Sequence, residues 1–434
     1  MIAQLLFTAM AAVAIYFFIK NVGKIRRNIL LGKDIDLSDR QPERWKTMAR
    51  VALGQSKMGS RPVPAFLHLI VYAGFILINV EVLEIFIDGF FGTHRALSFF
   101  GPLYNLAIGF FEILAFAVLL SCIVFLIRRF ILKIKRFTSP ELKGFPMRDA
   151  ATILFIEIIL MGALLKMNAA DQILQSRGFE HYIHAGSFPI SSWLVVPFFS
   201  HFSSETLMLF ERFAWWFHIL GIFLFMNYLP FSKHFHVILA FPNTYYSNLN
   251  AKGELNNMAS VTQEVKLMLD PAAIVPEGYS PPTSFGVKDI TDLSWKNLMD
   301  AYTCTECGRC TSSCPQNITG KLLSPRKIMM DTRDRLEEVG RNIDANKGSF
   351  VDDQKNLHSY ISEEELWACN TCNACVEACP VNINPMEIIV EMRRYKVMEL
   401  SSAPASVNSM FTNIENNQAP WQFSPMDRAN WTQE

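Results

Sequence analysis

The sequence is poor in charge. Only 18% of its 434 residues are charged, well below the roughly 25% that is usual for a soluble domain. The 40 basic and 40 acidic side chains cancel, so no excess positive charge points to a nucleic-acid partner. Charged residues are nearly absent from long stretches before about residue 242 and dense after it. We therefore expect a membrane part followed by a water-soluble part.

Cysteine is almost missing from the first 300 residues, where Cys122 stands alone. The other eight cysteines form two tight groups near the C-terminus. This distribution argues against a secreted disulfide scaffold. Because half of the residues are apolar, an intrinsically disordered chain is excluded as well. Cys122 lies in an apolar run, so we expect it to be a small buried packing residue.

Five apolar runs are long enough to cross a hydrocarbon core of about 30 Å, which needs roughly 20 residues. The first run has neither a basic segment before it nor a small-residue cleavage site after it, so we expect a retained helix rather than a signal peptide. Glu157 and Lys166 make the fourth run the weakest. The runs cover residues 2–19, 63–87, 102–127, 150–170 and 206–241.

Basic residues are concentrated in the loops after the first and third runs. The loop after the second run offers only Arg95, and the loop after the fourth has little beyond Arg177. Loops rich in lysine and arginine face the cytosol. We therefore expect a multi-pass protein of the cytoplasmic (inner) membrane, with its N-terminus outside and everything after the fifth run in the cytosol.

Histidines inside apolar runs are costly unless they have a partner. His68 and His236 lie near the cytosolic ends of the second and fifth runs, which are antiparallel, and this is the geometry of a bis-histidine b-type haem. At 100° per residue His218 lies on the same helix face as His236, about 27 Å away, whereas His234 points elsewhere. We predict His68 and His236 as ligands and place a second haem, if one binds, at His218. The alternative is that these histidines are interfacial and hydrogen-bonded to their neighbours.

A second haem needs another ligand near the outer ends of the helices. The second run offers no histidine there. Four histidines lie in the outer loops, and the sequence does not decide among them: His94, His181, His184 and His201.

Acidic residues are also drawn into the apolar runs. Glu81, Glu84 and Asp88 share one helix face, where they could handle protons or line a quinone pocket. We expect Glu84 and Asp88 simply to reach the outer headgroup region. Glu112 is the better candidate for a buried functional carboxylate.

Two stretches, residues 304–315 and 369–380, match the pattern C-x2-C-x2-C-x3-C-P. Three thiolates spaced by two residues can hold three corners of one [4Fe–4S] cubane, while the fourth reaches the other cluster. Zinc also uses paired C-x2-C, but it does not explain four cysteines and a proline in each of two repeats. We expect cluster one on Cys304, Cys307, Cys310 and Cys379, and cluster two on Cys369, Cys372, Cys375 and Cys314.

Each cysteine motif is followed by a helix signal. Ser324 before Pro325 predicts an N-cap and a helix to about Arg341, and Asn384 before Pro385, with Glu387 completing a capping box, predicts a helix to about Leu400. The expected fold is all-α, a five-helix transmembrane bundle followed by an α-helical two-cluster ferredoxin domain. The expected parts are a membrane cytochrome b-like domain at 1–242, a cytosolic connector at 243–294, the ferredoxin domain at 295–400 and a partner-docking tail at 401–434.

The membrane part resembles the cytochrome b gamma subunit of respiratory nitrate reductase and the membrane subunit of heterodisulfide reductase. Residues 295–400 resemble the two-cluster ferredoxin portion of heterodisulfide reductases. The fusion is similar to membrane iron–sulfur oxidoreductases that include electron-transfer-flavoprotein:menaquinone oxidoreductases. The membrane resemblance rests on His68, His218 and the run Leu229-Pro230-Phe231-Ser232-Lys233-His234-Phe235-His236.

The chain departs from this family in two places. Members with two haems carry a second histidine farther along the second helix, whereas residues 76–84 contain none. Residues 413–425 resemble the linker that leads, in fused relatives, into a cysteine-rich CCG-type catalytic domain. The resemblance therefore implies that this domain is a separate iron–sulfur subunit that docks on the C-terminal region.

Together these features predict a respiratory electron-transfer subunit. It would pass electrons between a cytosolic redox partner, such as an electron-transfer flavoprotein, and menaquinone or another quinone, through two [4Fe–4S] clusters and b-type haem. The sequence assigns no catalytic residue, and the substrate chemistry is expected on the CCG-type subunit. The alternative is a haem-free membrane polyferredoxin that supplies electrons for assembly or activation of another enzyme. A purely structural anchor would leave eight cysteines unexplained.

Overall fold

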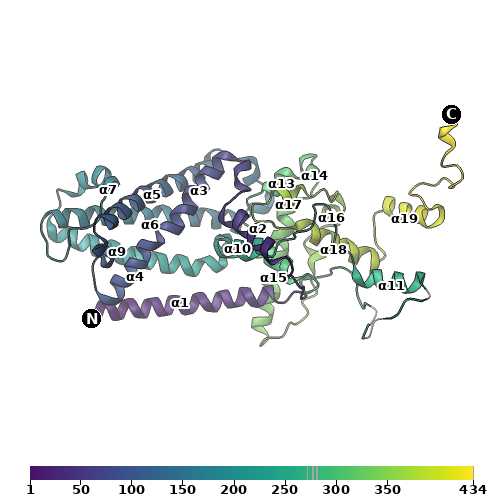
Figure 1. The fold of residues 1–434 in the computed structure, drawn as a ribbon, viewed down its shortest axis with the longest axis horizontal. Helices are drawn as coiled ribbons and strands as arrows, with labels where there is room; N and C mark the ends of the chain where they lie inside the picture. Colours follow the sequence, from purple (N-terminus) through teal and green to yellow (C-terminus); the bar gives the residue numbers. More distant parts are fainter. Residues whose placement is uncertain (271, 276–277, 280–281, 434) are drawn as a thin grey trace. The chain divides into compact units, whose positions relative to one another are not determined.

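The structure is a computed structural model that describes residues 1–270, 272–275, 278–279 and 282–433. Part of the connector expected at 243–294 lies outside these residues. Within them the chain is helical, as predicted, and its one β feature is an isolated parallel bridge between Lys33 and Ser294. The chain divides into two compact units (Figure 1). The first comprises Met1–Arg27, Arg44–Tyr245 and Tyr302–Gly308, and the second comprises Asn28–Glu43, Tyr246–Ala301 and Arg309–Glu434.

The described residues contain five helical segments long and apolar enough to cross a membrane, which confirms the predicted five-helix bundle. The second segment is broken at Ile78 into two helices, and the third ends in a π-helical turn at Ile127–Ile131. The helices of these segments are α1 (Ile2–Ile29), α3 (Pro62–Leu77), α4 (Asn79–Phe91), α5 (Pro102–Leu126), α6 (Phe145–Ser176) and α9 (Ser204–Tyr228). Shorter helices of this region are α2 (Gln41–Met48), α7 (Pro189–Leu194), α8 (Val196–Phe199) and α10 (His236–Tyr245).

The centre of the bundle is formed by α5, α6 and α9, which run side by side (Figure 1). Their shared core combines small and large side chains, among them Ala115, Leu164 and Ala214. A Cβ on Gly221 would lie 2.5 Å from the side chain of Leu160, so glycine allows α6 and α9 to approach closely. Small residues at helix contacts are typical of membrane bundles, where close packing replaces the hydrophobic effect between helices.

Helix α1 contacts the bundle through a buried cluster that includes Phe7, Ala11 and Ala14. Phe7 is fully buried, and its ring centre lies 5.7 Å from that of Phe86 in α4, 5.8 Å from Trp215 and 6.0 Å from Phe223 in α9. Edge-to-face and tilted aromatic pairs at these separations stabilise beyond their buried area. The first apolar run therefore packs as an integral helix of the first unit.

The fifth segment differs from its prediction. One long run from 206 to 241, with a kink possible at Pro230, was expected, but α9 ends at Tyr228 and is followed by two 3-10 turns, Leu229–Phe231 and Lys233–Phe235, before α10 begins at His236. Pro230 cannot donate a backbone hydrogen bond, and its ring is incompatible with a continuing helix. The helical phase that related His218 to His236 is therefore lost at this break.

The second unit is built around two longer helices that follow the cysteine motifs, α15 (Pro325–Ala345) and α18 (Pro385–Met398). The Ser324 side chain accepts from the Lys327 N–H, and the Asn384 side chain accepts from the Glu387 N–H, as the predicted caps require. The Asn384 backbone N–H donates to Asp300 rather than to Glu387, so the reciprocal capping box does not form. The remaining helices are α11 (Ala259–Leu269), α12 (Trp295–Thr303), α13 (Arg309–Ser313), α14 (Pro315–Ile318), α16 (Glu363–Ala368), α17 (Ala374–Ala378) and α19 (Ala405–Asn417).

Candidate iron–sulfur and histidine sites

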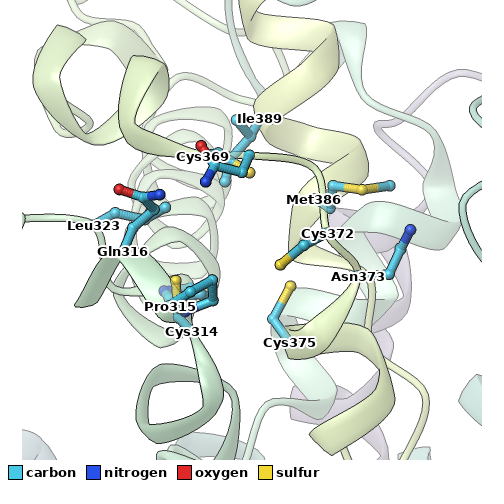
Figure 2. Close-up of a pocket in the computed structure, with 12 residues that line it drawn as sticks. Cys314, Pro315, Gln316, Leu323, Cys369, Cys372, Asn373, Cys375, Met386 and Ile389 are labelled. Carbon is cyan, nitrogen blue, oxygen red and sulfur yellow. The ribbon is translucent and has the colours of Figure 1, made fainter. Parts of the chain in front are cut away.

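The four cysteines predicted for cluster two line a single pocket in the second unit. They are Cys314, Cys369, Cys372 and Cys375, and Figure 2 shows the sulfur atoms of Cys314, Cys372 and Cys375 directed toward the same space. Apolar side chains complete the wall, including those of Leu323, Met386 and Ile389. Four thiols around one apolar pocket are a suitable ligand set for a cubane cluster.

The loop that carries Cys369 and Cys372 is shaped to present amide groups to sulfur. Thr371 and Asn373 have left-handed backbone conformations, with φ of 53° and 60°. The Thr371 N–H donates to Cys369 Sγ at 3.4 Å, and the Ile383 N–H donates to Cys379 Sγ at 3.3 Å. Hydrogen bonds to ligand sulfur are one of the ways in which a protein sets the potential of an iron–sulfur cluster.

Burial also favours metal coordination over free thiols at this site. It raises the pKa of Cys375 to about 12 and raises the pKa of Cys369. Such thiols do not ionise by themselves at neutral pH, whereas a bound metal ion stabilises the thiolate directly. Cys372 differs from the other three because it is exposed.

The cysteines predicted for cluster one are divided between the two compact units. Cys304 and Cys307 lie in Tyr302–Gly308 of the first unit, and Cys310 and Cys379 lie in the second. All four are buried or half-buried. Their assignment to one cluster therefore remains a prediction from the spacing.

His68 in α3 and His236 at the start of α10 face each other in the first unit. Their ring centres are 6.5 Å apart, and the ring planes are inclined by 43°. The Nδ1 atom of His68 is 3.1 Å from Gln55 Oε1, and that of His236 is 3.0 Å from the Lys233 carbonyl oxygen. Both acceptors are carbonyl oxygens, so each ring carries its proton on Nδ1 and its lone pair on Nε2.

His68 and His236 would hold one metal ion between their rings. A metal–imidazole bond of about 2.0 Å on each side separates the two ring centres by roughly 6.3 Å, close to the observed 6.5 Å. Metal-binding histidines almost always donate the other ring N–H to an oxygen acceptor, which fixes their orientation. His68 and His236 show both features, so the residues fit the predicted haem.

His234 does not share this arrangement. Its ring is perpendicular to that of His236, at 5.6 Å, and lies 5.4 Å from the ring of Phe225. Burial lowers the pKa of His234 to about 3, with smaller contributions from His236 and His68, so the ring is neutral. His234 is therefore a packing residue in this structure.

His218 lies inside α9 and is only 3% exposed. Its Nδ1 atom has no hydrogen-bond partner among the described residues. Of the four outer histidines, His94 and His181 come together, with ring centres 5.3 Å apart, and His94 Nε2 lies 3.5 Å from Asp171 Oδ1. The ligand set of a second haem at His218 remains a prediction.

Glu84 and Asp88 were expected to reach the outer headgroup region, and in the structure both carboxylates are hydrogen-bonded to protein groups. Glu84 is buried and accepts from the Leu97 N–H at 2.8 Å and from the Tyr104 hydroxyl at 2.9 Å. Asp88 accepts from the backbone N–H groups of Arg95 and Ala96 and from the Thr93 hydroxyl. Both carboxylates therefore hold the loop that follows α4.

Glu112 is buried, as expected, but its oxygens are occupied by protein donors. Oε2 accepts from the backbone N–H groups of Ile190 and Ser191, and Oε1 accepts from the Ser191 hydroxyl and the Asn168 amide. These contacts give Glu112 a structural role at the start of α7.

One buried ion pair in the first unit, between Lys233 and Glu306, was not expected from the sequence. The side chains are 8% and 3% exposed. Lys233 Nζ also donates to the Pro146 carbonyl at 2.7 Å and lies 3.9 Å from Asp149 Oδ2. The signals in the sequence are a lysine inside the fifth apolar run and a glutamate between two cysteines of the first motif. Neither signal identifies the other residue as its partner.

An apolar helical unit and two paired cysteine motifs define an iron–sulfur membrane protein. The profile of the 4Fe-4S dicluster domain family matches residues 303–383, which include both motifs. The chain therefore carries a domain of the kind that binds 4Fe–4S clusters.

Curated relatives are similar to this chain over nearly its whole length. It is 28% identical over 459 residues to the probable iron–sulfur-binding oxidoreductase FadF of Bacillus subtilis, covering 99% of this chain and 61% of the relative. It is 26% identical over 430 residues to the EtfAB:quinone oxidoreductase of Syntrophomonas wolfei, covering 93% and 56%. The chain thus spans about 60% of the length of these relatives.

A shorter match is to a subunit of a heterodisulfide reductase. The chain is 34% identical over 102 residues to one component of the ferredoxin/F(420)H(2)-dependent CoB-CoM heterodisulfide reductase of Methanosarcina acetivorans, covering 23% of this chain and 49% of the relative. No solved structure matches the chain. The chain is therefore similar to iron–sulfur oxidoreductases.

Proposed function

We propose that this chain is the membrane electron-transfer subunit of a quinone-linked oxidoreductase. It passes electrons between a cytosolic redox partner and the quinone pool. The observation that carries the proposal is the facing pair His68 and His236, with both Nδ1 atoms hydrogen-bonded to oxygen acceptors. The same chain carries two cysteine motifs for clusters that each transfer one electron at a time. These clusters would donate electrons to the histidine pair or accept electrons from it.

The cofactors supply single-electron steps, because a [4Fe–4S] cluster and a b-type haem each carry one electron at a time. The protein residues hold these groups at fixed places. Cys314, Cys369, Cys372 and Cys375 bind the second cluster, and Cys304, Cys307, Cys310 and Cys379 bind the first. His68 and His236 hold the haem inside the membrane unit, for which we propose a cytochrome of the nitrate reductase gamma type. Quinone binds in the membrane near this haem.

The cellular arrangement follows from the loop charges and the relatives. The basic loops after the first and third spans place the N-terminus outside and the cysteine motifs in the cytosol. The similarity to an EtfAB:quinone oxidoreductase supports an electron-transfer flavoprotein as the soluble partner and a quinone, such as menaquinone, as the membrane substrate. The similarity to a heterodisulfide reductase subunit supports a further partner subunit, and we propose that this subunit is of the CCG type.

The proposal is tested on the purified protein in lipid nanodiscs, prepared without oxygen. Reduction should produce the α band of a b-type haem, and a menaquinone analogue should reoxidise it. Well-folded protein that carries its iron–sulfur clusters but no haem would contradict the proposal. It would favour a haem-free membrane polyferredoxin.

A further inference from the structure

The two cysteine motifs share one backbone conformation. The residue before the second cysteine is left-handed in both, with φ of 55° at Glu306 and 53° at Thr371. The residue after that cysteine is left-handed as well, with φ of 71° at Gly308 and 60° at Asn373. The motifs are therefore structural repeats, and Glu306 corresponds to Thr371.

These corresponding side chains have different surroundings. Thr371 is half-buried, and its hydroxyl donates to the carbonyl of the preceding Asn370 at 2.7 Å. Glu306 is buried and pairs with Lys233. A left-handed conformation is unfavourable for an L-residue with a side chain, and burying a carboxylate is expensive unless it is paired. The turn alone therefore does not explain glutamate at this position, whereas the contact with Lys233 does.

Lys233 is firmly held in the first unit. Its backbone N–H donates to Asp149 Oδ2 at 3.2 Å, and the Tyr228 hydroxyl donates to Asp149 Oδ1 at 2.6 Å. Its Nζ donates to the Pro146 carbonyl at 2.7 Å. These bonds connect the start of α6 to the end of α9, so the Glu306 carboxylate meets an ammonium group of fixed position.

Lys233 also contacts the candidate haem ligand. Its carbonyl oxygen accepts from the His236 ring at Nδ1, at 3.0 Å. One residue thus joins His236, through its backbone, to Glu306, through its side chain. Glu306 lies between Cys304 and Cys307.

We propose that Lys233 and Glu306 are positioning residues that fix the first cysteine motif relative to His236, and that the first motif is the one that exchanges electrons with the membrane unit. This inference rests on the proposed function. The step is a one-electron transfer: the group at the first motif is oxidised by one electron, the group at His236 is reduced by one, and no proton or covalent bond moves. The second motif, with its exposed Cys372, then receives electrons from the soluble partner.

The experiment uses the full-length protein, with its cofactors, in nanodiscs. The test variants are Lys233→Met and Glu306→Gln, and the matched control is Thr371→Ala at the corresponding position of the second motif. Hydrogen–deuterium exchange of residues 302–308 should become about tenfold faster in both test variants, because each removes the buried ion pair that holds Glu306 in place. The control should leave exchange there unchanged.

A kinetic measurement separates positioning from general stability. After flash reduction of the clusters by a photoexcited flavin, the haem α band should appear about tenfold more slowly in both test variants, because the first motif is no longer held in place. Haem content and the two cluster signals in electron paramagnetic resonance should stay at wild-type levels. Lys233→Arg keeps the charge and should restore most of the rate.

Wild-type exchange and a wild-type rate in both test variants would overturn the inference. So would an equal loss of rate in Thr371→Ala. If the Lys233→Met variant does not assemble, the inference is tested with Glu306→Gln alone. In that variant Lys233 keeps Asp149 and the Pro146 carbonyl as neighbours. Absence of haem from the wild-type protein would instead refute the proposed function, and the exchange measurement would still report on the ion pair.

Discussion

Glu112 and Ser191 are joined by two hydrogen bonds across the first unit. The Ser191 hydroxyl donates to Glu112 Oε1 at 2.5 Å, and the Ser191 N–H donates to Oε2 at 3.3 Å. Because α7 begins at Pro189, which has no N–H, the Ile190 and Ser191 amides are its first donors, and both end on Glu112. A carboxylate at this end of a helix satisfies amides that have no partner within the helix.

Replacing Glu112 with alanine should therefore destabilise the first unit. The substitution leaves several buried donors unsatisfied, and we expect a loss of about 2 to 4 kcal/mol in the free energy of unfolding. Thermal unfolding in detergent micelles, followed by circular dichroism, measures the effect. Glu205→Ala is the control, because Glu205 is exposed at the start of α9. A loss below about 1 kcal/mol would show that the buried bonds contribute little.

Replacing the candidate haem ligands His68 and His236 should have a different effect from replacing their neighbour His234. His68→Ala and His236→Ala each remove one axial ligand, so the b-type absorbance should disappear, while the iron–sulfur signals persist. His234→Ala removes a ring that packs against Phe225 and should retain the haem. Absorbance spectra of the reduced proteins, together with haem extraction, decide the outcome. Equal haem content in His68→Ala and the wild type would exclude this ligand.

The second cluster should be removable without the first. Cys375→Ser takes one ligand from the pocket shared with Cys314, Cys369 and Cys372. Iron should then fall from about eight to about four atoms per chain, since each cubane holds four. Cys122→Ser is the control, because Cys122 is buried in α5, away from both motifs in the chain. Unchanged iron in Cys375→Ser would contradict the predicted ligand set.

Arg335 should be essential for the second unit. Its guanidinium is fully buried and donates to Asp289, to Asp353 and to the Lys355 carbonyl. Arg335→Met leaves these acceptors without their cation, and we expect a loss of about 3 to 5 kcal/mol in the free energy of unfolding. Chemical denaturation measures this loss.

Arg341 provides the control for Arg335 within the same helix, α15. Its side chain is 67% exposed, so Arg341→Met should change the free energy of unfolding by no more than about 0.5 kcal/mol. Similar losses in the two variants would mean that the buried hydrogen bonds of Arg335 contribute no more to the free energy of unfolding than the exposed Arg341 does.

Local signals were sufficient for much of the fold. A membrane span is determined by the length and polarity of a single run, so all five were predictable. The caps at Ser324 and Asn384 depend on the next three residues, and both were found. The cysteine motifs are equally local, and the pocket at Cys314, Cys369, Cys372 and Cys375 follows their spacing.

Features that depend on distant partners were not predictable from the sequence. Glu84 was expected at the headgroups because it lies toward the outer end of its run, whereas its donors Leu97 and Tyr104 lie in the next loop and helix. The ion pair of Lys233 and Glu306 joins residues 73 positions apart. A pattern shows that a charge must be paired, but the fold decides with which residue.

Cys372 is the motif cysteine most open to attack when the protein is handled in air. Among the eight motif cysteines it alone is exposed, and an oxidant dissolved in water reaches an exposed sulfur first. Dioxygen should therefore attack the second motif before the first. On the electron path proposed above, ageing in air should first interrupt transfer at the second motif, while transfer between the first motif and His236 should survive longest.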